Sequence, residues 1–424
     1  MLRFLENMQF ALFVFFTAAY AYQIVYLFVG LIGKGRGGRE DAKLHRYAAV
    51  VAARNESAVI ANLIRTLKEQ NYPSELLDIY VIADNCTDNT AQISRQAGAY
   101  VYERFNKVQV GKGYALEYLF RHIFEDKGET AYDGFFVFDA DNIVDRDFVR
   151  EMNKMFDTGE YTALTSYRNS QNFCANWISA GYALWFLRES RFLNRPRTQL
   201  GVNCAVSGTG FLVSAQAVRE DAGWPYHLLT EDIEFSIHEI LQGRKIAFCP
   251  DAVLYDEQPT TFRQSWRQRM RWSQGYLQVF RDYGARLLRG IFRGSFSCFD
   301  MSMAIMPAFV LSTVSILVNL TLGVVGALAG DNLLVAFESV GQMLLNIYLT
   351  LLVLGGITTI TEWKNIRTSP VKKIVYMFTF PLFMFTYIPI SLAAFFCKPQ
   401  WKPIEHRVSA AHLRSRDRQE LLPF

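Results

Sequence analysis

The stretch Gly134-Phe-Phe-Val-Phe-Asp139-Ala-Asp141 decides the fold, because an uncharged apolar run passes directly into two carboxylates. A short apolar run bounded by polar residues is typical of a strand that is buried on both faces. Two similar runs precede it, Tyr47–Ala53 and Leu77–Ala83, and a shorter strand is expected at Tyr100–Glu103. Polar clusters follow the three long runs, so each of these strands is predicted to end beside polar side chains.

Segments with apolar residues at helical spacing separate these strands, at residues 59–67 and at Tyr114–Phe124. Strands that alternate with helices predict an α/β fold, with a mostly parallel sheet and helices on both faces. Ligands of such sheets bind at the carboxyl ends of the strands. The polar residues that follow the strands are therefore the candidate site.

The composition excludes several classes of protein. The 424 residues are 51% hydrophobic and 20% charged, with a mean hydropathy of +0.07, so the chain is neither disordered nor an ordinary soluble domain. A net charge of +4, without a basic run interleaved with aromatic residues, predicts no nucleic-acid partner. The six cysteines contain no C-x-x-C pair, which excludes a zinc ribbon and indicates reduced thiols facing the cytosol.

Residues 1–33 are predicted to form an N-terminal transmembrane anchor. The uncharged stretch Phe10–Ile32 is long enough to cross a bilayer core of about 30 Å at about 1.5 Å per residue. A cleaved signal peptide is the alternative, but its apolar region should be only about 7–15 residues long. Basic residues from Lys34 to Arg46 predict that the following segment is cytoplasmic.

Three more apolar blocks predict a transmembrane bundle over residues 301–397, namely Met301–Ala329, Leu333–Ile360 and Ile374–Phe396. The loop between the last two blocks and the C-terminal tail 398–424 are both basic, which predicts that both are cytoplasmic. One crossing cannot join two segments on the same side. Either the last block is re-entrant, one block is miscounted, or the tail breaks the charge rule.

Residues 34–260 have a suitable length for one large cytoplasmic α/β domain. Residues 261–300 alternate arginines with apolar side chains, which predicts amphipathic helices in the headgroup plane. On such a helix Gln268, Arg271 and Trp272 share one face, where arginine can bind phosphate and tryptophan can face a sugar ring. A purely interfacial helix, with its arginines reaching toward water, is the alternative.

Two pairs of acids have the D-x-D spacing. Asp139 and Asp141 leave a strand together, and two such carboxylates can hold one divalent cation against a diphosphate. Asp145 and Asp147 lie where a helix N-terminus would favour acids. Either pair alone suits both roles, and we interpret the first as the metal site and the second as a helix cap.

The remaining candidates also have two interpretations each. Asp84 either accepts hydrogen bonds from a nucleotide or is a turn residue. Lys112 lies between two glycines before a helix and can supply a cation to phosphate, although the P-loop frame is absent. Glu231 and Asp232 either cap the following helix or provide a general base, because neighbouring negative charges raise the pKa of a carboxyl group.

Together these motifs resemble the membrane-embedded family 2 glycosyltransferases, a group that contains cellulose, chitin, hyaluronan and poly-N-acetylglucosamine synthases, with ceramide glucosyltransferase more distant. The resemblance covers about residues 47–276 and implies a GT-A type fold flanked by transmembrane and interfacial helices. Its motifs, in chain order, are Asp84, Lys112, Asp139-Ala140-Asp141, Thr230-Glu231-Asp232 and Gln268-x-x-Arg271-Trp272.

The resemblance implies a role for each of these residues. Asp141 would ligate Mg²⁺ or Mn²⁺. The catalytic residues would be Asp232, as the base, with Glu231 and Arg271. The substrate-binding residues would be Asp84, at the uridine, with Lys112, Asp139, Gln268 and Trp272.

The predicted reaction is a single inverting displacement, in which Asp232 deprotonates an acceptor hydroxyl while the cations stabilise the departing UDP. The predicted product is a β-linked polysaccharide, built from a UDP-sugar at the plasma membrane and passed across the bilayer. The aromatic side chains of Trp177, Tyr182, Trp185 and Phe186 either line an acceptor path or form plain core. A membrane lipid is the alternative acceptor, and a transporter or scaffold with an inert transferase domain is a third hypothesis.

Overall fold

The computed structural model of the protein describes residues 10–11, 14–15, 17–33, 35, 37–305, 321, 324 and 333–397, without the side chains of residues 333–340 and 343. The predicted basic tail 398–424 lies outside the described residues. So do most of the block Met301–Ala329 and part of the predicted N-terminal anchor.

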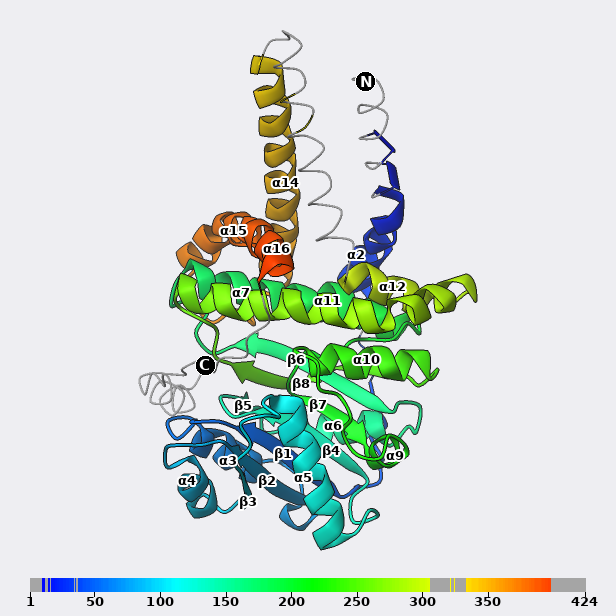
Figure 1. Cartoon of the computed structure of the whole chain (residues 1–424), viewed down its shortest axis with the longest axis vertical. Coiled ribbons are helices and arrows are strands. Elements are labelled where there is room, and N and C mark those ends of the chain that lie inside the picture. The colour runs from blue at the N-terminus through cyan, green and yellow to red at the C-terminus, as the bar shows by residue number, and fades with distance from the viewer. Residues whose placement is uncertain are drawn as a thin grey trace.

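The predicted parallel strands form one half of the sheet. They are β1 (Tyr47–Ala53), β2 (Leu77–Asp84), β3 (Tyr100–Arg104) and β4 (Gly134–Asp139), with β2–β3, β1–β2 and β1–β4 paired in parallel. Their carboxyl ends therefore meet at one edge. Figure 1 shows this half of the sheet at the end of the molecule farthest from the apolar helices.

The other half of the sheet has mixed direction. It contains β5 (Ile143–Val144), β6 (Ala163–Ser170), β7 (Phe211–Ser214) and β8 (Ile246–Asp256). Strand β7 is antiparallel to both β4 and β6, whereas β6 and β8 are parallel. The described chain thus has one sheet in the order β3-β2-β1-β4-β7-β6-β8-β5, in which four of the seven pairings are parallel. The α/β fold with a mostly parallel sheet is confirmed.

Helices cover both faces of the sheet, as predicted. Side chains of β4 alternate between two cores, so that Phe135 and Val137 pack on one face and Phe136 and Phe138 on the other. The helices of this region are α3 (Ile60–Lys68), α4 (Thr90–Gln96), α5 (Lys112–Lys127), α6 (Phe148–Phe156), α7 (Trp177–Glu189), α8 (Arg195–Gln199), α9 (Ala215–Glu220) and α10 (Glu231–Leu241), with a 3₁₀ turn at Ser74–Leu76 and a π-helical segment at Ser190–Asn194.

A layer of long helices separates the sheet from the apolar helices (Figure 1). The predicted amphipathic region is one continuous helix, α11 (Phe262–Phe292), followed by α12 (Phe296–Ile305). Helix α11 runs beside α7, and Tyr182 of α7 makes a hydrogen bond of 3.1 Å with the hydroxyl of Ser265. The N-terminal helix α2 (Tyr22–Ile32) joins this layer through Tyr22, which donates to Asp300 at 2.8 Å.

The apolar helices are α14 (Leu333–Thr361), α15 (Pro370–Phe385) and α16 (Tyr387–Phe396). Within the described chain two segments are long and apolar enough to cross a membrane, Leu344–Thr361 and Pro370–Phe396, and the segments Thr17–Ile32 and Phe296–Ile305 are shorter. Figure 1 shows α14 rising away from the sheet, whereas α15 and α16 bend over α7 and α11. The last predicted block is thus divided into two helices at Thr386.

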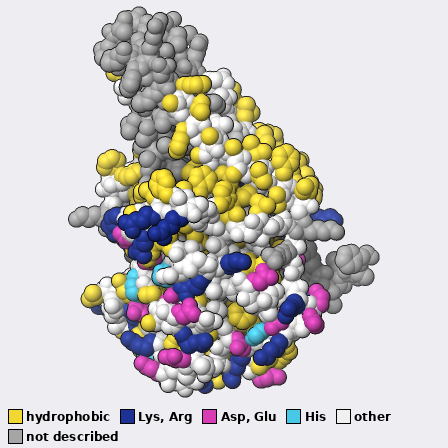
Figure 2. Space-filling model, turned by 90° about the vertical axis from the view of Figure 1, so that its right-hand side faces the viewer, with side chains coloured by type: hydrophobic (Ala, Val, Ile, Leu, Met, Phe, Trp, Pro, Cys, Tyr) yellow, Lys and Arg dark blue, Asp and Glu magenta, His cyan; other side chains and the backbone are white. Residues whose placement is uncertain are grey.

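The surface reflects the same division. Figure 2 shows hydrophobic side chains gathered over the helical end and charged side chains over the sheet end. At the boundary Gly181 of α7 allows α15 to approach closely, because a Cβ at this position would lie 2.3 Å from the ring of Phe383. The apolar helices are therefore packed directly on the helix layer that covers the sheet.

Candidate active site

Lys112 connects the end of β4 to the loop before β7. Its Nζ atom donates to Asp139 Oδ1 at 2.5 Å and to the carbonyl of Gly208 at 2.5 Å. Burial alone would lower the pKa of Lys112, but the carboxylates of Asp139, Glu231 and Asp232 outweigh this effect and raise it. The ammonium group therefore remains charged at neutral pH.

The start of α5 fits this position only with a glycine after the lysine. A Cβ on Gly113 would lie 1.9 Å from the carbonyl oxygen of Tyr226. Gly113 thus permits a close backbone approach, and Gly111 adopts a positive φ of 148° before it, so the side chain of Lys112 reaches the strand ends.

Glu231 and Asp232 form the first turn of α10 next to this lysine. Glu231 is buried, with 6% of its surface exposed, and Asp232 Oδ2 lies 3.4 Å from the position that a Cβ on Gly208 would take. Burial raises the pKa of both carboxyl groups, and the charges of Lys112 and Arg271 partly oppose the shift. The third acid of this turn, Glu234, accepts hydrogen bonds from the Leu228 amide and the Tyr283 hydroxyl and is held structurally.

The Gln268, Arg271 and Trp272 group lies on α11 where this helix crosses α10. Gly275 allows the crossing, because a Cβ there would lie 2.5 Å from Thr230 Cγ2. Arg271 Nη1 donates to the carbonyl of Leu229 at 3.1 Å, which places its charge beside the two acids. The structure thus brings Arg271, Glu231, Asp232 and Lys112 together.

The other two residues of this group differ in their surroundings. Gln268 Oε1 is buried and has no hydrogen-bond partner among the described residues. Trp272 packs edge to face against Tyr182 and Phe186, with ring centroids 5.8 and 6.3 Å apart. Tyr182 and Phe186 are themselves 1% and 6% exposed, so the plain-core interpretation holds for both of these aromatic residues.

Asp141 lies in the turn after β4. Its Oδ2 accepts from the Glu257 amide at 3.4 Å, and its carbonyl accepts from Gln171 at 2.7 Å. The nearby Asp256 lies at the end of β8, and its pKa is raised overall. Burial is the largest cause and the charges of Asp141 and Asp139 add to it, whereas the charge of Arg168 opposes the shift. Three carboxylates thus influence one another where β4 and β8 end.

Sequence reasoning did not find Arg168 or Asp256. Arg168 donates to Asp256 at 2.6 Å and to the carbonyl of Ser207 at 2.9 Å. Arg168 lies in the polar strand β6 and Asp256 is the last residue of β8, and neither belongs to a recognisable motif. Only the pairing of β6 with β8 places them beside the D-x-D turn.

The donor set at the β4 end fits a divalent cation. Mg²⁺ and Mn²⁺ prefer carboxylate oxygens and usually complete their coordination with substrate phosphates and water. Asp139 and Asp141 offer two such carboxylates at a partly exposed edge, with 41% of the Asp139 side chain accessible. A cation shared with a diphosphate therefore suits these residues.

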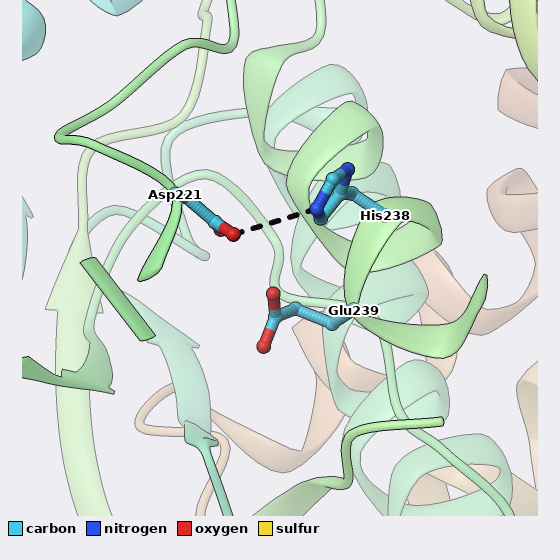
Figure 3. A group of neighbouring side chains, drawn as sticks. All are labelled: Asp221, His238 and Glu239. Atoms are coloured by element: carbon cyan, nitrogen blue, oxygen red, sulfur yellow. Dashed lines mark ion pairs between the residues drawn. The ribbon is translucent and has the colours of Figure 1, made fainter. Parts of the chain in front are cut away.

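A second acidic cluster lies on the far part of α10. Figure 3 shows Asp221, His238 and Glu239, the described group of three potential ligands whose atoms lie within 4.8 Å of one another. Arg244 already pairs with Asp221 at 2.8 Å and with Glu239 at 2.7 Å. Arg244 offsets one of the two carboxylate charges and contacts both groups, so a cation at this cluster would have to compete with the arginine.

Asp84 makes a buried ion pair at the end of β2. Arg104 Nη1 donates to Asp84 Oδ1 at 2.6 Å, and the two side chains are 5% and 7% exposed. The pair fixes the turn after β2, at the same edge as Asp139. The neighbouring Asp88 accepts from the amide of Thr90 at 3.0 Å and thus stabilises the start of α4.

The second D-x-D pair is held by local structure. Asp145 accepts from the amide of Asp147 at 3.2 Å, and Asp147 pairs with Arg150 at 3.0 Å at the start of α6. Asp147 is the N-cap residue of α6, so the pair lies at a helix N-terminus as predicted, but the side chain of Asp147 makes no capping hydrogen bond.

Residues 45–275, more than half of the chain, match the family described as "Glycosyltransferase like family 2". The chain belongs to this family. All the candidate residues described above lie within the matched region, which begins before β1 and ends within α11.

Two curated family 2 relatives have different products in their names. The β-monoglucosyldiacylglycerol synthase of Synechocystis sp. is 28% identical over 239 residues, which cover 55% of this chain and 48% of that protein. The poly-β-1,6-N-acetyl-D-glucosamine synthase of Staphylococcus epidermidis is 24% identical over 249 residues, 58% of each chain. This chain thus spans about half the length of the curated relatives that it matches.

A solved structure has the same fold over nearly the whole chain. The mannosyltransferase PcManGT from Pyrobaculum calidifontis, in complex with GDP-Man and Mn²⁺, superposes with a TM-score of 0.58 at 16% identity and covers 92% of this chain and 99% of that one. Family 2 membership and this likeness agree on a GT-A type fold.

Proposed function

We propose that this family 2 enzyme is an inverting hexosyltransferase that uses a UDP-sugar. The observation that carries the proposal is the position of Lys112, which contacts Asp139 and Gly208 and whose charge reaches Glu231 and Asp232. A cation between a strand-end carboxylate and a buried acid suits a diphosphate leaving group beside a general base.

The donor would lie along the polar edge of the sheet. Asp84 would contact the uridine, while Lys112, Asp139 and Gln268 would contact the polar groups of the sugar nucleotide. Asp141 would hold Mg²⁺ or Mn²⁺, which supplies positive charge to the diphosphate. The ring of Trp272 packs edge to face against Tyr182 and is partly exposed. Its exposed part would face the acceptor sugar or lipid.

Asp232 is the proposed base. It takes the proton of the acceptor hydroxyl as that oxygen forms a bond to the anomeric carbon and the bond to UDP breaks. The raised pKa of Asp232 supports this role, because a base is more effective when its pKa approaches the working pH. Glu231 adds a neighbouring charge, and Arg271 stabilises the leaving diphosphate.

Product analysis tests the reaction. The purified full chain is incubated with Mg²⁺ or Mn²⁺ and, in separate reactions, UDP-glucose, UDP-N-acetylglucosamine, UDP-galactose, UDP-glucuronate and GDP-mannose. We expect transfer from one of the UDP-sugars with inversion, seen as a β-anomeric proton by NMR. Transfer from GDP-mannose alone would contradict the proposed donor, and no transfer from any donor would favour the inert-domain hypothesis.

The proposed location is the plasma membrane, with the catalytic domain in the cytoplasm. The candidate spans Leu344–Thr361 and Pro370–Phe396 support this location, as does the arginine-bearing helix α11 between them and the sheet.

The acceptor is either a growing polysaccharide or a membrane lipid. The sequence favoured a polysaccharide, and the named product of the staphylococcal relative agrees with it. The burial of Tyr182 and Phe186, which removes them from an acceptor path, favours a lipid, as does the named product of the cyanobacterial relative. Separating labelled products by size decides between them, because a lipid carrying only one or two sugars would exclude the polysaccharide.

A further inference from the structure

A polar cavity lies between the sheet and the lower end of α14, apart from the catalytic groups. Its volume is about 350 Å³, within the usual range of ligand-binding pockets. Its walls come from β6, β8, the π-helical segment, α8 and the loop after α14. The lining residues are Tyr167, Asn169, Arg191, Arg195, Pro250, Asp251, Val253, Tyr255, Glu362, Lys364, Asn365 and Arg367.

The cavity and the catalytic site use opposite faces of the same two strands. Tyr167 lines the cavity, whereas its neighbour Arg168 donates to Asp256 and to the Ser207 carbonyl on the catalytic side. Likewise Tyr255 lines the cavity and Asp256 does not. Because side chains alternate along a strand, a ligand in this cavity would be separated from the donor site by the sheet.

The cavity carries an excess of positive charge. Four of its lining residues are basic (Arg191, Arg195, Lys364 and Arg367) and two are acidic (Asp251 and Glu362). Glu362 is already engaged, since it accepts from the Tyr167 hydroxyl at 2.5 Å and from the Asn365 amide at 2.6 Å.

Two of the arginines have unused donors. The buried Nε atoms of Arg191 and Arg195 have no hydrogen-bond partner among the described residues. Burial and the neighbouring charge of Arg191 lower the pKa of Arg195, despite the opposing charges of Glu362 and Asp251. Arg191 Nε forms a long ion pair of 3.9 Å with Glu362 Oε1, whereas no ion pair of Arg195 or Lys364 is found within the described part of the chain. Unpaired guanidinium donors beside a cavity are suited to an oxyanion.

The cavity also lies at the level of the proposed membrane surface. Glu362 directly follows the candidate span Leu344–Thr361, and the exposed Lys364 and Arg367 come from the loop that leaves it. A group at the headgroup level would therefore reach the cavity without crossing the sheet.

We infer that this cavity is a second anion site, which binds a phosphate group through Arg191, Arg195, Lys364 and Arg367. The phosphate comes either from a phospholipid headgroup or from a free phosphate in solution. Both sources present the same oxygens to the guanidinium and ammonium groups.

Calorimetric titration of the detergent-purified full chain tests the inference. UDP and Mn²⁺ are kept saturating, so that the catalytic phosphate positions are filled. The probes are dihexanoyl phosphatidic acid, dihexanoyl phosphatidylcholine and inorganic phosphate. We expect saturable binding of phosphatidic acid and at least tenfold weaker binding of phosphatidylcholine, because the choline group opposes the basic cavity. Binding of inorganic phosphate would identify free phosphate as a sufficient source, whereas its failure to bind would identify the lipid.

Matched variants separate the cavity from general surface charge. We expect Arg195→Gln combined with Lys364→Gln to weaken the binding of phosphatidic acid about tenfold or more. The control variant combines Arg289→Gln with Arg293→Gln and removes two exposed charges of the helix layer. We expect it to change the affinity for phosphatidic acid less than about twofold. Unchanged affinity for UDP shows that each variant is folded. If the Arg195→Gln, Lys364→Gln variant does not fold, Lys364→Gln alone, at an exposed position, is used in its place. No binding of phosphatidic acid or phosphate, unchanged binding in the cavity variant, or equal losses in both double variants would overturn the inference.

Discussion

Lys112 Nζ lies 2.5 Å from Asp139 Oδ1, so the first residue of α5 neutralises the last residue of β4. Asp139 remains 41% exposed, whereas Lys112 is only 17% exposed. The lysine is therefore enclosed by protein, and the aspartate keeps one side toward solvent. The pair therefore holds the ammonium group in place at the strand end while the carboxylate of Asp139 remains accessible to a ligand.

Replacing Asp232 with asparagine should abolish transfer and spare donor binding. Loss of a positioned general base typically lowers kcat by about 10²–10⁴-fold, whereas Asp232 makes no proposed contact with the uridine. Release of UDP with acceptor present measures kcat, and calorimetry measures UDP-sugar affinity. The control is Asp282→Asn, at an exposed position of α11. Retained turnover in Asp232→Asn would remove this residue from the role of base.

Replacing Asp141 with asparagine should weaken metal-dependent binding of the donor. A lost carboxylate ligand removes both a hard oxygen donor and a charge, so we expect at least a tenfold weaker affinity for Mn²⁺ in the presence of UDP. Electron paramagnetic resonance of Mn²⁺ reports the bound fraction. Asp147→Asn, in the other D-x-D pair, is the matched control and should bind Mn²⁺ normally. Equal affinities in the two variants would disprove the assignment of Asp141.

Replacing Lys112 with methionine should shift the acidic limb of the pH profile of kcat to higher pH. Asp232 acts deprotonated, so turnover falls as the pH drops through its raised pKa. Lys112 lowers that pKa, and its removal raises it further. Lys112→Arg keeps the charge and should leave the limb in place. A limb that stays fixed or moves to lower pH in Lys112→Met would refute the electrostatic link.

Replacing Asp84 with asparagine should lower stability as well as donor affinity. Breaking a buried ion pair on one side costs about 3–5 kcal/mol, because the other charge is left uncompensated. Asp84→Asn combined with Arg104→Gln should recover much of the stability by removing that charge. Denaturant unfolding and UDP titration are the two measurements. If the double variant also regains normal UDP affinity, Asp84 has only a structural role.

Replacing Glu239 with glutamine should change how stability depends on pH. Burial raises the pKa of Glu239 to about 7, with Arg244 opposing and Asp221 adding to the shift. The folded state therefore binds this proton more tightly than the unfolded state. The corresponding stability is present below the ordinary glutamate pKa of about 4.5 and is lost as the pH rises through about 7.

We therefore expect the melting temperature of Glu239→Gln, relative to the parent, to rise by a few degrees between pH 5 and pH 8, since 1 kcal/mol corresponds to about 2–4 °C. Glu220→Gln, at a more exposed partner of Arg244, is the control. A constant difference across this pH range would show that Glu239 does not titrate there.

The sequence determined the parallel half of the sheet and the order of the site motifs. Strands β1, β2 and β4 are short, buried apolar runs followed by polar residues, and Asp139 and Asp141 lie at the end of the last of them. Strand β6 is rich in polar residues, and Pro250 and Asp251 interrupt the apolar run of β8, so neither segment has the uninterrupted apolar pattern of the first strands.

Tertiary structure alone decided which of the motif residues meet. Asp232 and Lys112 are far apart in the chain, and they are brought together because Gly113, Gly208 and Gly275 allow backbones to approach where a Cβ would collide or strain the turn. The same packing revealed Arg168 with Asp256, and the basic cavity on the opposite face of their strands. These contacts depend on the pairing of distant segments, which no local pattern of residues encodes.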